Sequence, residues 1–249
     1  MYTNYIFDLY GTLADIHTNE QKAYFWKKLA CYLSLKGASY TPKELRTAFR
    51  QLLTEEDQKQ KTSLQNNQSN LHPETIYPEP NIAHVFEQLF SNKGITAAND
   101  EICDFAILWR TISLERLCLF DGVPELLQRL KATGKRIYLL SNAQALFTRP
   151  ELNLLGLTEY FDGILLSSEA GIKKPDPAFF RMLLSKYNLK PEESVMTGND
   201  DIADGHGAAA AGLDSFYIYT TQSPKRTLPL PGNCREITHM SQVFPDTNP

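Results

Sequence analysis

The sequence is poor in cysteine, with four in 249 residues. They are widely separated, with no Cys-x-x-Cys pair and no Cys/His spacing typical of zinc, at positions Cys31, Cys103, Cys118 and Cys234. Neither a zinc centre nor a disulfide framework is therefore expected. We expect the four thiols to be buried as small hydrophobic side chains in a reducing compartment.

Long apolar runs and basic clusters are also missing. No run of about 18 apolar residues occurs, and the first eight residues lack the basic start and apolar stretch of a signal peptide. Lys and Arg are scattered in a chain of formal net charge -4, so no patch suited to nucleic acid or an anionic membrane is expected. We expect a cytoplasmic protein with a small-molecule partner, and the sequence does not indicate an oligomeric state.

Strand and helix patterns alternate over the second half of the chain. The apolar run Tyr5-Ile6-Phe7 ends at Asp8 and is broken by Gly11, which is typical of a buried strand and a tight turn. After Cys118 we predict strands at 136–140, 163–166, 194–197 and 215–219, and helices at 124–132, 143–155, 177–187 and 202–211. This order is typical of a parallel α/β sheet with helices on both faces.

A long segment with helical periodicity interrupts this pattern. We predict helices at 22–35, 42–50, 82–90 and 100–117, with a capping box formed by Thr41 and Glu44 around Pro42. The polar residues 57–70 predict an exposed loop, because hydrophobic side chains are scarce there. The predicted organisation is thus a discontinuous core of residues 1–18 and 119–249 and a helical domain of residues 19–118.

Polar clusters follow four of the predicted strands. They comprise Asp8 with Thr12, Ser141 with Asn142, Lys174, and Asn199 with three aspartates at 200, 201 and 204. Ligands of an open parallel sheet bind at the carboxyl ends of its strands, so we expect these clusters to meet there.

Each cluster offers a distinct chemistry. Asp8 can act as a nucleophile that forms an ester-like intermediate, unless it merely caps the turn after its strand. Ser141 and the amide of Asn142 can bind an anion at the start of a helix, although a plain helix cap is the alternative. Lys174, held extended and inward by Pro175, can neutralise developing charge. Asp200, Asp201 and Asp204 require a cation nearby, and oxygen ligands suit Mg²⁺.

The ordered set of motifs resembles the haloacid dehalogenase superfamily. The resemblance rests on residues 7–13, Ser141-Asn142, residues 174–177, and Gly198-Asn199-Asp200 with Asp204. It implies a Rossmann-like core with a mobile helical cap inserted after the first motif. It further implies that Asp8 is the nucleophile, that Ser141 and Lys174 stabilise substrate and intermediate, and that Mg²⁺ is held by Asp8, the carbonyl of Tyr10, Asn199 and Asp204.

Two positions depart from the phosphatases of that family. Tyr10 stands where they place a second aspartate, the general acid and base, and Asn199 stands where an aspartate usually binds metal. A tyrosine at this position is similar to the 2-haloacid dehalogenases, although Phe180 replaces a tyrosine found in them. We expect a Mg²⁺-dependent phosphatase acting on a small phosphorylated metabolite, in which Tyr10 could donate a proton. A dehalogenase and a non-catalytic metabolite-binding relative are the alternatives.

The helical segment holds candidate specificity residues. Aromatic and basic side chains that could line an aromatic or anionic pocket are Tyr24, Trp26, Lys27, Lys28, Tyr32, Arg46 and Arg50. The alternative is that they form core packing and solvated helix faces.

Overall fold

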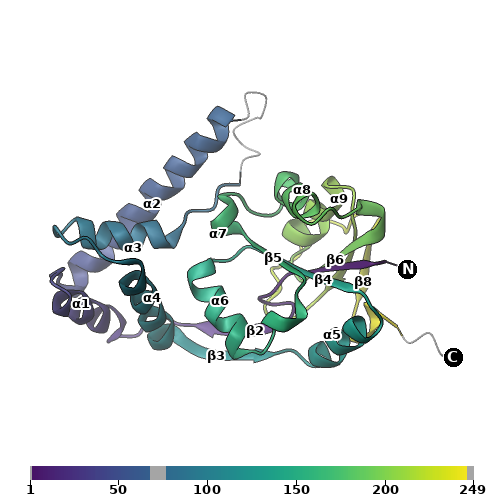
Figure 1. Ribbon diagram of the computed structural model, residues 1–249, viewed down its shortest axis with the longest axis horizontal. Helices are drawn as coiled ribbons and strands as arrows, with labels where there is room; N and C mark the ends of the chain where they lie inside the picture. The colour runs from purple at the N-terminus through teal and green to yellow at the C-terminus, as the bar shows by residue number, and fades with distance from the viewer. Residues whose placement is uncertain (1, 68–76, 246–249) are drawn as a thin grey trace.

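The computed structural model describes residues 2–67 and 77–245, and it has two parts (Figure 1). A sheet with flanking helices forms one end, and a group of helices forms the other. Within the described residues, no helix is long and apolar enough to cross a membrane.

The sheet has six strands in the order β5-β4-β1-β6-β7-β8, and every neighbouring pair is parallel. The strands are β1 (Asn4–Phe7), β4 (Arg136–Ser141), β5 (Gly163–Leu166), β6 (Ser194–Gly198), β7 (Asp214–Ile218) and β8 (Cys234–Ile237). The chain builds outward from β1 on one side and then returns to build outward on the other. The point where the strand order reverses therefore lies beside β1, which is where open α/β sheets bind ligands. The predicted α/β fold is confirmed, with β8 as an additional strand.

Alternate residues of β1 bury into opposite faces of the sheet. Tyr5 and Phe7 pack on the face covered by α5, whereas Ile6 packs on the face covered by α8 and α9. This follows from the two-residue period of a strand. The helices of the core are α5 (Val123–Ala132), α6 (Ala145–Leu154), α7 (Ser167–Ala170), α8 (Pro177–Lys186) and α9 (Gly207–Ala210). Short helical turns occur at η2 (Thr158–Tyr160), η3 (Pro191–Glu193), η4 (Asp201–His206) and η5 (Met240–Gln242).

The helical part is joined to the core by an antiparallel ribbon of two strands. These are β2 (Ala14–Thr18) and β3 (Leu114–Leu119), which lie between the helices and the sheet (Figure 1). The helices are α1 (Phe25–Leu35), α2 (Pro42–Asn67), α3 (Ile82–Ser91) and α4 (Asn99–Ser113). They share a core that is rich in aromatic side chains, including Phe25, Phe86, Phe105 and Trp109. This core is separate from those on the two faces of the sheet.

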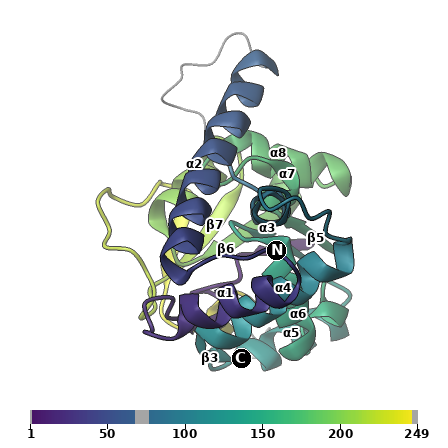
Figure 2. The same ribbon diagram turned by 90° about the vertical axis from the view of Figure 1, so that its left-hand side faces the viewer.

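Helix α2 continues well past the predicted end at residue 50 and reaches Asn67. The exposed loop expected over 57–70 is therefore wrong for residues 57–67. Residues 68–70 of that prediction lie outside the described part of the chain. The helix projects beyond its neighbours (Figure 2). Its polar side chains pair one turn apart, as Gln51 does with Glu55 at 2.8 Å and Gln60 with Glu56 at 3.1 Å, and such pairs stabilise an exposed helix. Glu56 is also buried and lies 2.9 Å from His84 of α3. Although burial raises the pKa of Glu56, these hydrogen bonds hold it below its usual value.

Three other predictions need correction. The helix expected over 100–117 ends at Ser113, because the chain then pairs with β2 as strand β3. The helix expected over 202–211 begins as a π turn, Asp201–His206. The cysteines are not buried: Cys31 and Cys118 are exposed, and Cys103 and Cys234 are partly exposed, because they lie on outward faces of their elements. All four thiols are free. The capping box at Thr41 and Glu44 is confirmed by reciprocal bonds of 2.8 and 3.2 Å.

Candidate active site

Asp8 leaves β1 into a tight turn that requires glycine. Gly11 has a φ of +81°, a conformation that side chains disfavour, and a Cβ there would lie 2.3 Å from Nδ2 of Asn199. The side chain of Asn199, at the end of β6, therefore packs directly against this turn. The end of β1 and the end of β6 are thus brought together at the carboxyl edge of the sheet.

Lys174 lies between two carboxylates. Its Nζ is 2.8 Å from Oδ1 of Asp8 and 2.6 Å from Oδ1 of Asp204, and the lysine is 3% exposed. Burial lowers the pKa of Lys174, but the two carboxylates raise it above its usual value. The lysine therefore remains an ammonium group, with charge-assisted bonds to both acids.

The two oxygens of Asp8 have different surroundings. Oδ1 accepts hydrogen bonds from Ser141 Oγ at 2.9 Å and from Lys174. Among the residues that the structure describes, the hydroxyl of Thr12 is the one hydrogen-bonding group near Oδ2, at 3.4 Å, and that hydroxyl also lies 3.2 Å from Oδ1 of Asn199. A hydroxyl has one proton, so it can donate to only one of these two oxygens. Oδ2 consequently keeps lone pairs for another bond.

Asn142 holds the loop that carries Lys174. Its Nδ2 donates to the Lys174 carbonyl at 2.9 Å, and its Oδ1 accepts from the Lys174 N–H at 2.8 Å. The helix start expected at Asn142 is wrong, because α6 begins only at Ala145. The N–H groups of Ala143 and Ala145 instead donate to the hydroxyls of Ser167 and Ser168 at 2.8 Å. Asn142 still lines the same cavity as Asp8 and Lys174.

The three aspartates after β6 have three different environments. Asp204 is buried, and its Oδ2 accepts from the Asp200 N–H at 3.0 Å. Burial and the nearby Asp8 raise the pKa of Asp204 to about 7, although Lys174 opposes the shift. Asp200 caps the π turn with bonds of 2.9 and 2.8 Å to two backbone N–H groups. Asp201 is buried, and its Oδ2 has no partner within the described residues.

Tyr10 has its hydroxyl committed to helix α6. The hydroxyl donates to Glu151 and lies 2.9 Å from Oγ1 of Thr148. Burial, and then the charge of Glu151, raise the pKa of Tyr10 above its usual value. Neither Glu151 nor Thr148 lines the catalytic cavity, so this phenol is poorly placed to protonate a leaving group.

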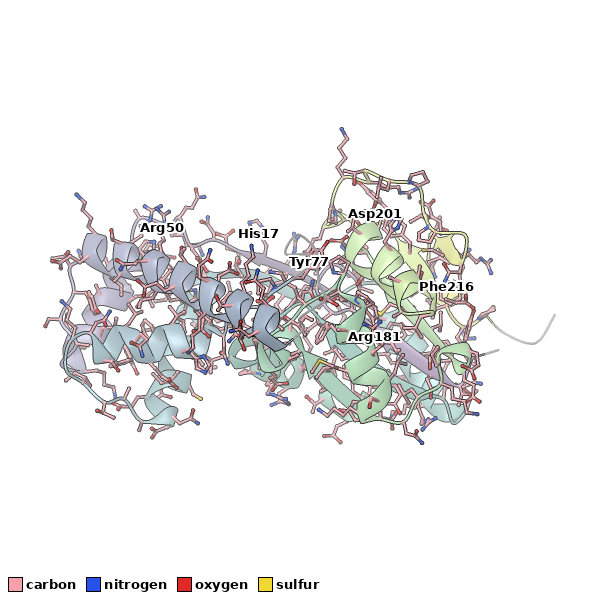
Figure 3. All side chains as sticks on the ribbon, turned by 90° about the horizontal axis from the view of Figure 1, so that it is seen from above. His17, Arg50, Tyr77, Arg181, Asp201 and Phe216 are labelled. Carbon is pink, nitrogen blue, oxygen red and sulfur yellow. The ribbon has the colours of Figure 1, made fainter. Side chains whose placement is uncertain are left out.

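Side chains and backbone of the helical part contact the core close to Asp8 and Lys174. Arg110 of α4 forms an ion pair with Glu151, with 2.6 Å between Nε and Oε1. The carbonyl of Tyr77 accepts from the N–H of Lys173 at 3.0 Å, and Figure 3 shows Tyr77 between the helices and the core. Burial raises the pKa of Glu151, while Arg110 and Tyr10 oppose that shift. Sequence reasoning missed Arg110 and Glu151, because no motif marks either residue.

A cavity of about 190 Å³ opens over these groups. The predicted residues Asp8, Tyr10, Ser141, Asn142, Lys174, Asn199 and Asp204 all line it, as do Gln222 and Pro224, which the sequence did not single out. The amide of Gln222 is anchored to β2 by a 2.7 Å bond from Nε2 to the carbonyl of Ile16. Ligand pockets typically span about 300–1,000 Å³, so this space suits a small group.

The oxygen atoms around this cavity define what cation the site can hold. In residues 2–67 and 77–245, no three side chains of His, Cys, Asp or Glu are grouped as metal ligands. Both oxygens of Asp204 already bond to Lys174 and to the N–H of Asp200. Of the other oxygens around the cavity, Oδ2 of Asp8 and Oδ2 of Asp200 are carboxylate oxygens, because both cap bonds of Asp200 go to its Oδ1. Asn199 and the carbonyl of Tyr10 offer neutral oxygens. Carboxylates together with neutral oxygens and water fit the hard cation Mg²⁺.

Comparison with known sequences places this geometry in a family. The profile of the haloacid dehalogenase-like hydrolases matches residues 2–212. The phosphoserine phosphatase of Thermus thermophilus is 34% identical over 103 residues, which cover 41% of each chain. The ribulose-1,5-bisphosphate 5-phosphatase of Halopiger xanaduensis is 35% identical over 114 residues, which cover 46% of this chain and 48% of that protein. The chain thus spans about half the length or less of these relatives.

Solved structures agree in fold over almost the whole chain. A 2-haloacid dehalogenase from Pseudomonas syringae has a TM-score of 0.57 at 20% identity, covering 98% of this chain and 96% of its own. A phosphatase of the same superfamily from Thermococcus onnurineus has a TM-score of 0.55 at 18% identity, covering 97% and 95%. The order of the motifs, the sheet topology and the match over residues 2–212 lead to one conclusion: the chain belongs to the haloacid dehalogenase-like hydrolase family.

Proposed function

We propose that the protein is a Mg²⁺-dependent phosphatase that hydrolyses a small phosphorylated metabolite through a phosphoaspartyl intermediate on Asp8. The observation that carries this proposal is the asymmetry of the Asp8 carboxylate. Oδ1 is held by Ser141 and Lys174 at 2.9 and 2.8 Å, whereas Oδ2 has a long contact of 3.4 Å with Thr12. A carboxylate fixed at one oxygen presents the other to an electrophile in a defined direction.

The reaction proceeds in two displacements. In the first, a carboxylate oxygen of Asp8 attacks phosphorus, and the bond from phosphorus to the ester oxygen breaks, with its electron pair leaving on that oxygen. In the second, water attacks phosphorus, the bond from phosphorus to the Asp8 oxygen breaks with its electron pair returning to the carboxylate, and the protons of the water leave with the released inorganic phosphate or pass to solvent. The ammonium of Lys174 and the hydroxyl of Ser141 neutralise charge on the phosphoryl oxygens, because both already point at the Asp8 carboxylate.

Asp8, Asn199 and the Tyr10 carbonyl would hold Mg²⁺, and Asp204 would take part on release from Lys174. Such an ion, when bound, supplies positive charge beside the transferred phosphoryl group. The raised pKa of Asp204 supports a need for positive charge at this place, since burial and Asp8 disfavour its carboxylate.

The environment of Tyr10 restricts the substrate. Its hydroxyl bonds to Glu151 and Thr148, so the position that related phosphatases give to a second aspartate holds a phenol whose proton is already donated elsewhere. A leaving group must then depart without a proton, so acyl and aryl phosphates should react faster than alkyl phosphates. Residues 19–118 would act as the cap that selects among them.

A 2-haloacid dehalogenase is the second candidate, and Tyr10 favours it. Halide departs without protonation, so a dehalogenase reaction would need no proton from the Tyr10 hydroxyl. Against it, Asp204 is a buried carboxylate 2.6 Å from the same lysine, which adds negative charge where a carboxylate substrate would bind. The phosphatase relatives from Thermus and Halopiger also favour phosphoryl transfer.

A parallel assay tests the proposal. Phosphate release from a panel of acyl, aryl and alkyl phosphates and halide release from 2-haloacids would be measured with Mg²⁺ and with a chelator. Phosphate release that requires Mg²⁺ and disappears in Asp8→Asn is expected. Halide release that is unaffected by the chelator would establish the dehalogenase instead. No turnover of either class, with ligand binding retained in Asp8→Asn, would indicate a non-catalytic binding protein.

A further inference from the structure

A second cavity lies in the helical part, away from the catalytic residues. Its volume is about 570 Å³, which is within the range of small-molecule sites. It lies between the end of β2, the start of α1 and the first half of α2, and no residue lines both this cavity and the catalytic one. Figure 3 shows two of its lining residues, His17 and Arg50, along the same edge of the helical part.

Two guanidinium groups at this cavity lack partners. Arg46 and Arg50 are one turn apart on α2 and both line the cavity. Across residues 2–67 and 77–245, neither side chain forms an ion pair or a hydrogen bond. Like charges one turn apart repel each other slightly, so the pair is not explained by helix stability. Two arginines on one face present several fixed N–H donors, which is the geometry that binds carboxylate or phosphate.

One carboxylate lines the cavity, and its position is fixed by a neutral partner. Glu20 lines the cavity, but its Oε1 accepts from Nε1 of Trp109 at 2.9 Å. His17 also lines it, and Nε2 of His17 lies 3.1 Å from Glu115, which additionally pairs with Lys22 at 3.2 Å. The lining therefore carries the two charges of Arg46 and Arg50 against the single carboxylate of Glu20, which leaves an excess of positive charge for an anion.

Aromatic rings form the other wall. Trp26 and Phe49 both line the cavity, with ring centroids 5.8 Å apart, and Trp26 packs edge-on against Trp109 at 5.3 Å. Phe49 and Trp109 are held in the core of the helical part, so Trp26 is supported from behind and remains partly exposed. A partly exposed ring on a rigid base can stack on a flat ligand at low entropic cost.

We propose that this cavity binds an organic anion that carries an aromatic ring, of the class of nucleoside monophosphates. The anion lies against Arg46 and Arg50, and the ring lies on Trp26. The site does not depend on the proposed phosphatase reaction, because it shares no residue with the catalytic cavity.

Tryptophan fluorescence provides the test, since the two tryptophans of the chain are Trp26, which lines the cavity, and Trp109, whose ring lies 5.3 Å from that of Trp26. The full chain carrying Asp8→Asn, which should not turn over phosphate esters, would be titrated with AMP, adenosine and inorganic phosphate. We expect saturable quenching by AMP, with adenosine and phosphate each binding at least tenfold more weakly. The double variant Arg46→Gln/Arg50→Gln in the same background should weaken AMP binding at least tenfold. Circular dichroism would verify that it is folded.

The control variant Lys27→Gln/Lys43→Gln also removes two positive charges, one from α1 and one from α2. Neither of these lysines lines the cavity. It should bind AMP as the parent does. Equal affinity of the arginine variant and the parent would overturn the proposal, as would equal losses in the arginine and lysine variants. Phosphate binding as tightly as AMP would refute the role of the ring. With Asp8 restored, the arginine variant should hydrolyse acetyl phosphate at the parent rate, so failure of the catalytic proposal is detected separately.

Discussion

Replacing Tyr10 by aspartate should convert the site to one with a general acid. In the native protein the phenol donates to Glu151 and contacts Thr148, and neither of these two residues lines the cavity over Asp8. An aspartate side chain is too short to reach α6, so its carboxyl would lie on the cavity side of the turn after β1. There it could protonate a departing alkoxide and later deprotonate the attacking water.

The expected gain can be set against the structural cost. General acid-base catalysis contributes about 10²–10⁴-fold, which is roughly 3–5 kcal/mol of activation free energy. Loss of the hydrogen bond to the charged Glu151 should lower the free energy of unfolding by about 1.5–3 kcal/mol. The ion pair of Glu151 with Arg110 limits this loss, because the carboxylate keeps one partner. The gain in rate should therefore be measurable in a folded protein.

The assay compares kcat/KM for an alkyl and an aryl phosphate in Tyr10→Asp and Tyr10→Asn. The asparagine variant loses the same contacts but cannot transfer a proton, so it is the matched control. Tyr10→Asp should exceed Tyr10→Asn by at least about tenfold on the alkyl phosphate, with a much smaller difference on the aryl phosphate. Equal rates of the two variants on the alkyl phosphate would refute the reasoning that an acid is missing.

Three further measurements test other features. Lys174→Met should abolish turnover and lower the free energy of unfolding by roughly 3–5 kcal/mol, because two buried carboxylates lose their cation. Lys173→Met should lower the free energy of unfolding by less than about 1 kcal/mol, and urea titrations of both variants measure the difference. Gly198→Ala should lose activity, because its Cβ would lie 2.1 Å from a carboxylate oxygen of the site; Gly232→Ala, with no atom within 4 Å, should retain it. The pKa of Glu56 is held below its usual value by hydrogen bonds despite burial, so its stabilising effect is present above about pH 4.3 and is lost as the pH falls. The stability difference between the parent and Glu56→Gln should therefore shrink in chemical denaturation below that pH, and a constant difference would contradict it.

The strands and the catalytic cluster could be predicted because they depend on local patterns. Tyr5, Ile6 and Phe7 are all apolar, as a strand buried on both faces requires, and Asp8 follows directly. Short apolar strands separated by helices fix a parallel sheet, and a parallel sheet brings its carboxyl ends to one edge. The proximity of Asp8, Lys174 and Asp204 follows from that topology.

Other features depend on contacts that no local pattern encodes. Strand β8 contains Arg235 and Glu236, which are exposed, so its residues lack the apolar signature of a strand. Helix α2 is polar beyond residue 56, and it stays helical because its side chains pair along the helix and Glu56 meets α3. The Tyr10 hydroxyl donates its proton to Glu151, which lies 141 positions away in the sequence, so no local pattern predicts this hydrogen bond.

The ribbon of β2 and β3 has a consequence for how this protein could diversify. The chain departs from the core along one strand and comes back along its hydrogen-bonded neighbour, with Ala14 opposite Leu119. Topologically, everything between the two strands is the loop of a hairpin. Exchanging that loop for a different one, long or short, would leave the order of the sheet untouched, so the specificity of the protein can evolve as a replaceable module while its chemistry stays fixed.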